Sequence, residues 1–106
     1  MENINISGSR NVFFIPTVNF DVETGKCELS GESFLEDTEE FYKPLLNWLE
    51  DRIALKKPID FTFRLSYFNT SSSKSILDIL IILKKFQDEG GKVEIRWYYD
   101  GEDIDL

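Results

Sequence analysis

The segment from Ile59 to Tyr99 constrains the fold of this 106-residue chain more than any other part of it. Apolar and polar residues alternate from Ile59 to Phe68, which is typical of a β-strand with one buried face. A helical pattern follows from about Ser72 to Glu89, and Gly90-Gly91 can end it with a left-handed cap. Alternation returns from Val93 to Tyr99. Strand, helix and strand at this spacing predict a right-handed crossover between parallel strands.

The alternation in the first of these strands predicts which face of the sheet is covered. A parallel sheet with helices on both faces would show nearly continuous apolar runs, so clean alternation indicates helices mainly on one face. The predicted covered face carries Ile59, Phe61, Phe63, Leu65 and Tyr67, and the predicted open face carries Asp60, Thr62, Arg64 and Ser66.

The first half of the chain predicts a hairpin and a helix. Two alternating runs, 17–22 and 26–31, flank the turn residues 23–25. Asp37, followed three positions later by Glu40, is typical of a helix start, and Pro44 predicts a kink or a later start. We therefore expect a small single-domain α/β fold in the order β-β-α-β-α-β with a mixed sheet. Residues 1–10 are expected to form a flexible N-terminal arm, and residues 11–106 the domain.

Composition narrows the classes of function. The net charge is −8 without a long basic run, which disfavours nucleic acid and anionic membrane surfaces as partners. The chain has no histidine and one cysteine, Cys27, which argues against histidine-dependent catalysis and an ordinary zinc site. We expect no catalytic residues, no cofactor and no metal. No apolar stretch reaches the length of a membrane span and no signal-peptide core is present, so a cytoplasmic location is expected.

The candidate functional site is the polar junction between the Ile59–Phe68 strand and the helix that follows. In open α/β sheets ligands gather at the carboxyl ends of strands, and the first amides of a helix lack intrahelical partners. Ser, Thr and Asn are also the preferred helix N-caps, so capping alone is an alternative explanation. The junction residues are Asn69, Thr70, Ser71, Ser72, Ser73 and Lys74.

Four motifs together resemble the SiaC family of bacterial regulatory phosphoproteins. They are Gly31-x-Ser33, Pro44-x-x-x-Trp48-Leu49, Tyr67-Phe68-Asn69-Thr70-Ser71-Ser72-Ser73-Lys74 and Trp97-Tyr98-Tyr99-Asp100. The similarity covers about Pro16 to Asp103, and the central octamer is its most specific part. Leu35 stands where the family usually has proline, which alters a loop.

The resemblance implies a STAS-like fold, as in anti-sigma-factor antagonists, and a role in partner switching, signal transduction and biofilm regulation. It implies that a dedicated kinase phosphorylates Thr70, that a PPM-type phosphatase removes the phosphate, and that the unmodified form binds a downstream target. In at least part of the family that target is a diguanylate cyclase. The neighbours Asn69, Ser71, Ser72, Ser73 and Lys74 would surround the phosphate and contact partners.

Two alternatives belong to other functional classes. The junction could serve an enzyme or a small anion- or ligand-binding domain, although the absence of histidine and of a glycine-rich phosphate loop weighs against this. The chain could also be a constitutive interaction scaffold in which the hydroxyl residues only cap the helix. Phosphorylation by the cognate kinase separates the switch from the scaffold.

Overall fold

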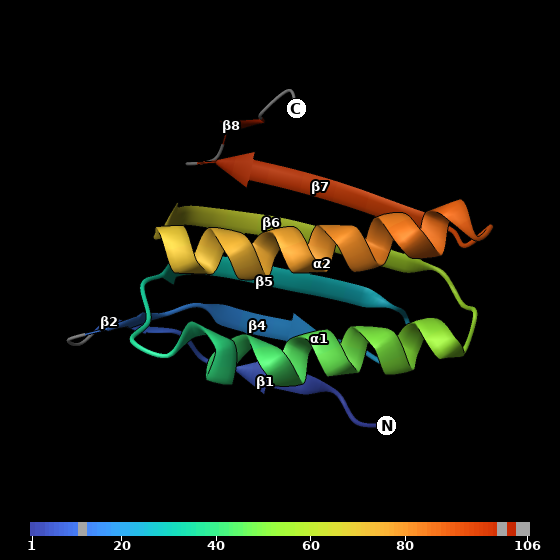
Figure 1. Ribbon diagram of the computed structural model, residues 1–106, viewed down its shortest axis with the longest axis horizontal. Coiled ribbons are helices and arrows are strands. Elements are labelled where there is room, and N and C mark those ends of the chain that lie inside the picture. The colour runs from blue at the N-terminus through green and yellow to red at the C-terminus, as the bar shows by residue number, and fades with distance from the viewer. Residues whose placement is uncertain (11–12, 100–101, 104–106) are drawn as a thin grey trace.

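The computed structural model describes residues 1–10, 13–99 and 102–103 of the chain. Two α-helices cover one face of a six-stranded sheet, and a two-stranded ribbon lies beside it (Figure 1). The fold is thus the small α/β domain with a mixed sheet that the sequence predicts. Its elements are β1 (Ile4–Ile6), β2 (Ser9–Arg10), β3 (Phe14–Ile15), β4 (Thr17–Phe20), β5 (Lys26–Ser33), α1 (Thr38–Ala54), β6 (Ile59–Phe68), α2 (Thr70–Asp88), β7 (Val93–Tyr99) and β8 (Glu102–Asp103).

The sheet has the order β1-β4-β5-β6-β7-β8. Strands β4 and β5 form the predicted antiparallel hairpin, whereas β5, β6 and β7 are parallel neighbours. The two parallel connections pass through α1 and α2, which lie side by side in front of the sheet in Figure 1. The carboxyl ends of β5 and β6 therefore meet at the same end of the molecule as the first turns of both helices.

The N-terminal residues differ from the expected loose arm. Strand β1 pairs with β4, with Ile4 opposite Phe20, and β2 pairs with β3. The indole nitrogen of Trp48 also donates to the carbonyl oxygen of Glu2 at 2.7 Å. Ile4 and Ile6 pack against the core, so this short polar segment has enough apolar surface and backbone pairing to join the sheet.

Both helices begin at side-chain caps. The carboxylate of Asp37 accepts a hydrogen bond from the amide of Glu40, and α1 continues through Pro44 from its start at Thr38. Of the two alternatives expected at Pro44, a kink or a later start, the later start is therefore wrong. The side chain of Asn69 caps α2, which begins two residues earlier than the sequence pattern indicates.

The predicted glycine cap ends α2. Gly90 has a φ of 99°, and the amides of Gly90 and Gly91 donate to the carbonyls of Gln87 and Phe86. This is the Schellman arrangement, in which a glycine takes the left-handed conformation at little steric cost.

The core lies between the sheet and the helices. Alternate residues of β6 supply its centre, and Leu45 and Leu49 of α1 and Ile79 and Leu83 of α2 pack onto it. Full burial of one such side chain contributes roughly 1.5–3 kcal/mol to the stability of the folded state. The β6 side chains that are 2% exposed or less are Ile59, Phe61, Phe63 and Leu65.

The alternation of β6 breaks near its end. Gly31 of β5 pairs with Leu65 but Glu32 pairs with Tyr67, so Ser66 is an extra residue in β6. Because a one-residue shift exchanges the two faces of a strand, Tyr67 leaves the core face and is 49% exposed. The sequence prediction that Tyr67 faces the core is therefore wrong. Phe68 turns to the helix side instead and packs edge-on against Trp97.

Candidate functional site at the β6–α2 junction

The junction forms where β6 ends and α2 begins. Asn69 is the N-cap of α2, and its side-chain oxygen accepts hydrogen bonds from the amide of Ser72 at 3.0 Å and the hydroxyl of Ser71 at 3.2 Å. The amide of Asn69 donates to the carbonyl of Ser33 at the end of β5. The backbone of two neighbouring strand ends thus fixes the first turn of the helix.

The hydroxyl residues of the junction are not equivalent. Ser72 is fully buried and Ser75 is 6% exposed, so both belong to the interior. The hydroxyl of Ser71 bonds that of Thr38 at 2.9 Å, and the hydroxyl of Ser73 donates to the carbonyl of Thr70 at 2.7 Å. These four serine residues are therefore either buried or engaged in local hydrogen bonds.

Thr70 differs from its neighbours. It is the first residue of α2 and is exposed, and within the part of the chain that the structure describes its hydroxyl has no hydrogen-bond partner. Lys74, one turn later, is also exposed and forms no salt bridge with a described residue. The sequence pattern indicates a helix start at about Ser72, whereas the structure places Thr70 at the first position of α2, where the residue is exposed.

Two amides at this helix start remain without partners among the described residues. The amide of Ser72 bonds the Asn69 side chain, and that of Ser73 bonds the Asn69 carbonyl. The amides of Thr70 and Ser71 form no hydrogen bond with any described residue. Helix N-termini carry a partial positive charge, so these two amides could stabilise an anion attached to Thr70.

A buried hydroxyl network lies below the junction, and sequence reasoning did not find it. The hydroxyl of Ser72 donates to the carbonyl of Ser33 at 3.0 Å, and the hydroxyl of Ser33 donates to that of Ser72 at 2.8 Å. The hydroxyl of Tyr42 in α1 lies 2.7 Å from that of Ser33, and burial raises the pKa of Tyr42 to about 12. The Gly31-x-Ser33 motif is the only sequence signal that could have indicated this role of Ser33.

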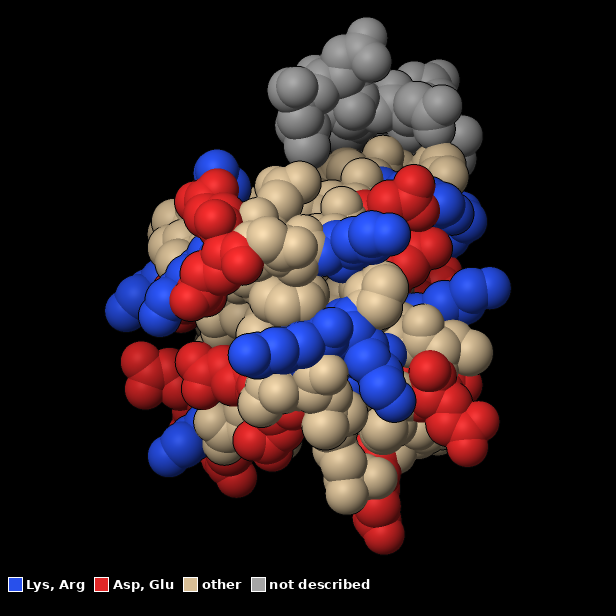
Figure 2. Space-filling view, turned by 90° about the vertical axis from the view of Figure 1, so that its right-hand side faces the viewer, with Lys and Arg blue, Asp and Glu red and all other residues tan. Residues whose placement is uncertain are grey.

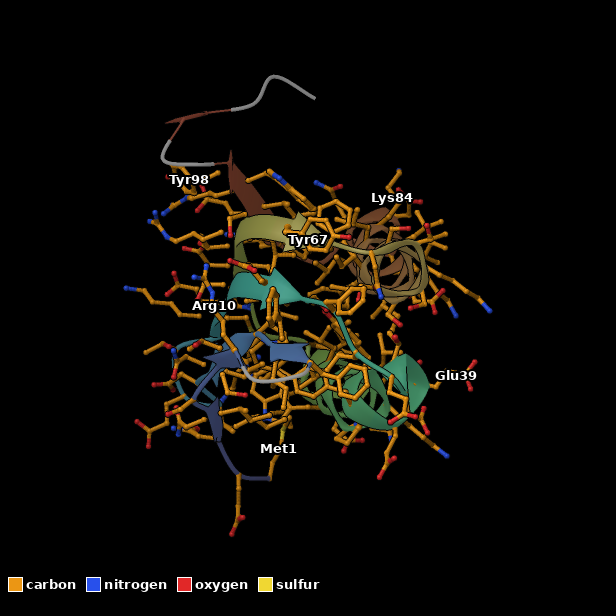
Figure 3. All side chains as sticks on the ribbon, turned by 90° about the vertical axis from the view of Figure 1, so that its left-hand side faces the viewer. Met1, Arg10, Glu39, Tyr67, Lys84 and Tyr98 are labelled. Carbon is orange, nitrogen blue, oxygen red and sulfur yellow. The ribbon has the colours of Figure 1, made fainter. Side chains whose placement is uncertain are left out.

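Figures 2 and 3 show the two opposite ends of the molecule. Figure 3 faces the end that carries the start of α2, with Tyr67 at its centre, Arg10 on the open side of the sheet and Glu39 on the helix side. Figure 2 faces the opposite end, where acidic and basic side chains are interspersed.

No group of metal-binding side chains is found among the described residues, and none of the helices described is long and apolar enough to cross a membrane.

Comparison with known proteins identifies the family. A model described as "SiaC family regulatory phosphoprotein" matches residues 9–106. The chain belongs to the SiaC family. The sequence resemblance to this family is thereby confirmed, and the chain is similar to regulatory phosphoproteins. The last motif of that resemblance ends at Asp100, which lies outside the described residues.

The relatives of this SiaC-family chain include proteins of Pseudomonas aeruginosa. An uncharacterized protein of strain UCBPP-PA14 is 32% identical over 101 residues, which cover 94% of this chain and 78% of the relative. The crystal structure of apo-SiaC is 32% identical and superimposes with a TM-score of 0.88, covering 94% of this chain and 81% of SiaC. SiaC in complex with the diguanylate cyclase SiaD, which it activates, is 30% identical with a TM-score of 0.80, covering 93% of this chain and 78% of that one.

Proposed function

We propose that this chain is a non-enzymatic switch protein whose phosphorylation on Thr70 controls binding to a downstream protein. A dedicated kinase adds the phosphate, a PPM-type phosphatase removes it, and the unmodified form binds the target. The observation that carries this proposal is the exposed residue Thr70 at the first position of α2, whose hydroxyl has no hydrogen-bond partner among the described residues. The target is a diguanylate cyclase; the complex of the relative SiaC with the cyclase SiaD supports this.

The helix start suits a phosphate. Phosphorylation adds a charge of about −1.5 to −2 and three strong acceptor oxygens. The amides of Thr70 and Ser71 are the donors nearest along the chain, and Lys74 supplies a positive charge one turn later. Because these groups are already placed, the modified residue needs no rearrangement of the fold.

The partner surface extends from Thr70 along α2. Leu77 and Ile81 are 54% and 55% exposed, and they follow Thr70 by 7 and 11 positions, which places all three on one side of the helix. An apolar stripe on the outer side of a helix is suited to pack against another protein. Phosphate at its N-terminal end would have to be desolvated against that protein, and an uncompensated buried charge costs several kcal/mol.

Site mapping tests the modified residue. The purified chain is treated with the kinase of its own organism, and intact mass and fragment spectra locate the phosphate. Thr70→Ala should abolish the added mass, while Thr70→Ser and Ser71→Ala should keep it, because the first retains a hydroxyl at the position and the second leaves Thr70 unchanged. Full modification of Thr70→Ala would show that another hydroxyl is the acceptor.

Calorimetric titration with the diguanylate cyclase tests the switch. Wild type and Thr70→Ala should bind, and the phosphorylated protein should bind at least about one hundred times more weakly, since each 1.4 kcal/mol is about tenfold in affinity. Thr70→Asp should show a smaller loss because one carboxylate carries less charge than phosphate. Equal binding by all forms would indicate a constitutive scaffold, and tighter binding by the phosphorylated form would reverse the direction of the switch.

A further inference from the structure

Four aromatic rings form a surface on the open face of the sheet, at the end that carries Thr70. Phe34 is central: the ring centroids of Phe13, Phe14 and Tyr67 lie 6.4, 6.3 and 6.4 Å from its own. Phe13, Phe34 and Tyr67 are 36%, 40% and 49% exposed. We call these four residues the aromatic patch. It is separate from the apolar stripe of α2, which lies on the helix side.

Two features of the backbone bring the rings of the patch together. The extra residue Ser66 turns Tyr67 to the open face, as described above, and Phe34 pairs with Phe14 through backbone hydrogen bonds of 2.9 Å in both directions. A shallow hollow of about 480 Å³ lies between Phe14, Phe34 and Tyr67. Aromatic side chains that are held rigidly beside a hollow are typical anchor points of protein interfaces.

Acidic residues follow the patch along the chain. The carboxylate of Glu32, which lines the hollow, is paired with Arg10. The segment that leaves Phe34 then carries four exposed acidic residues before Lys43. It leads from the patch toward the helix side, where Figure 3 shows Glu39, at the same end of the molecule as Tyr67. The four are Glu36, Asp37, Glu39 and Glu40.

We propose that the aromatic patch binds a segment of a partner protein that has an aromatic or aliphatic anchor residue flanked by lysine or arginine. The anchor would enter the hollow, and the basic residues would face the acidic segment that follows Phe34. A second copy of this chain fits less well, because two molecules of charge −8 would bring like-charged acidic segments together. The proposal goes beyond the Thr70 switch, because it requires neither phosphate nor α2.

Two synthetic peptides of about 15 residues, designed as amphipathic helices, provide the probe. Both carry the same leucine and tryptophan face; one has lysine and the other glutamate at the remaining positions. Fluorescence anisotropy of labelled peptide is measured against wild type, the double variant Phe34→Ser and Tyr67→Ser, and the matched control Leu55→Ser and Ile95→Ser. Leu55 and Ile95 are 48% and 44% exposed, so the control removes similar exposed apolar side chains outside the patch.

The lysine peptide should bind wild type and the control equally, and the patch variant at least about tenfold more weakly. The glutamate peptide should bind wild type at least about tenfold more weakly than the lysine peptide. A second variant, Glu36→Lys with Glu39→Lys, leaves the rings in place and should reverse the preference between the peptides. It keeps the test decisive if the patch variant does not fold. Thr70→Ala should bind as wild type does, which separates this result from the switch.

Three results would overturn the proposal. Unchanged binding by a folded patch variant would show that the rings are not the anchor site. Equal binding of both peptides to wild type would show that the acidic segment does not select the partner. Sedimentation that finds a wild-type dimer and a monomeric patch variant would assign the patch to self-association.

Discussion

Ser33 and Ser72 are joined by two hydrogen bonds, although 39 positions separate them in the chain. One bond runs from the Ser33 hydroxyl to the Ser72 hydroxyl, and the other from the Ser72 hydroxyl to the Ser33 carbonyl. Both residues are fully buried. The end of β5 is thereby fixed against the first turn of α2, directly beneath the Thr70 position.

Removal of the Ser72 hydroxyl should destabilise the fold. Ser72→Ala would leave the hydroxyl of Ser33 without its acceptor in the interior, and a buried unpaired polar group costs about 1–3 kcal/mol. Ser73→Ala is the matched control, because Ser73 is half-buried and its hydroxyl bonds the Thr70 carbonyl and no other described residue. Urea denaturation should show a clear loss for Ser72→Ala and a change within about 0.5 kcal/mol for the control. Equal midpoints for the two variants would contradict the structural role of Ser72.

The Tyr42 and Ser33 hydroxyls should be energetically coupled. Tyr42→Phe and Ser33→Ala each remove one partner of the 2.7 Å bond, so each single change leaves the other group buried and less satisfied. The double variant should lose less stability than the sum of the two singles, by about 0.5–3 kcal/mol. A double-mutant cycle from denaturant melts measures this coupling, and simple additivity would argue against the network.

The stability of the fold should fall in alkaline solution because two buried groups, Cys27 and Tyr42, lose their protons there. Burial raises the pKa of Cys27 from 9.0 to about 12 and that of Tyr42 from 10.0 to about 12. The folded protein thus holds both protons more tightly than the unfolded chain does. This contribution is fully present below pH 9 and is lost as the pH rises toward 12, with a slope of at most about 1.4 kcal/mol per pH unit for each group.

Two variants separate the contributions of Cys27 and Tyr42 to the loss of stability at high pH. Cys27→Ala should flatten the stability profile from pH 9 upward, and Tyr42→Phe should flatten it from pH 10 upward. Denaturant melts at a series of pH values, at constant ionic strength, provide the comparison. Profiles parallel to that of wild type in both variants would rule out these groups as the cause.

Phosphorylation of Thr70 should leave the domain folded. Its hydroxyl has no described hydrogen-bond partner to lose, and a negative group at a helix N-terminus stabilises by about 0.3–1 kcal/mol at exposed positions. Thermal melts of the modified protein and of Thr70→Asp should therefore be cooperative, with midpoints at or slightly above that of wild type. A broad, uncooperative melt of the modified form would contradict the local character of the change.

Local sequence patterns predicted the frame of this molecule and the polar junction that contains Thr70. Alternation located β6, and the Asp37 signal and the Gly90 cap located helix ends, because each depends on neighbours within a few residues. The prediction that helices lie on one face also holds, since it follows from the polarity of alternate residues in a single strand. The SiaC-family motif singled out Thr70 as the expected phosphorylation site, and in the structure this residue is exposed at the first position of α2.

Features that depend on pairing between distant segments could not be predicted. Nothing in the sequence of β6 alone shows that Ser66 is skipped, because the shift is defined against β5. The partnership of Ser33 with Ser72 requires the register of two parallel strands, and the pairing of Ile4 with Phe20 requires β4 to be in place first. Tyr67, Ser33 and the N-terminal strand were therefore misplaced or missed.

The central position of β6 also has a consequence for the order of folding. Its two neighbours, β5 and β7, are both parallel to it, so each pairing must wait until a complete helical connection has closed. The β4–β5 hairpin, in contrast, needs only the turn around Gly25. Non-local parallel pairing is intrinsically slow. Truncation of Phe63 should therefore slow refolding, whereas truncation of Ile4 at the edge of the sheet should mainly speed unfolding, and stopped-flow kinetics of the two variants can measure this difference.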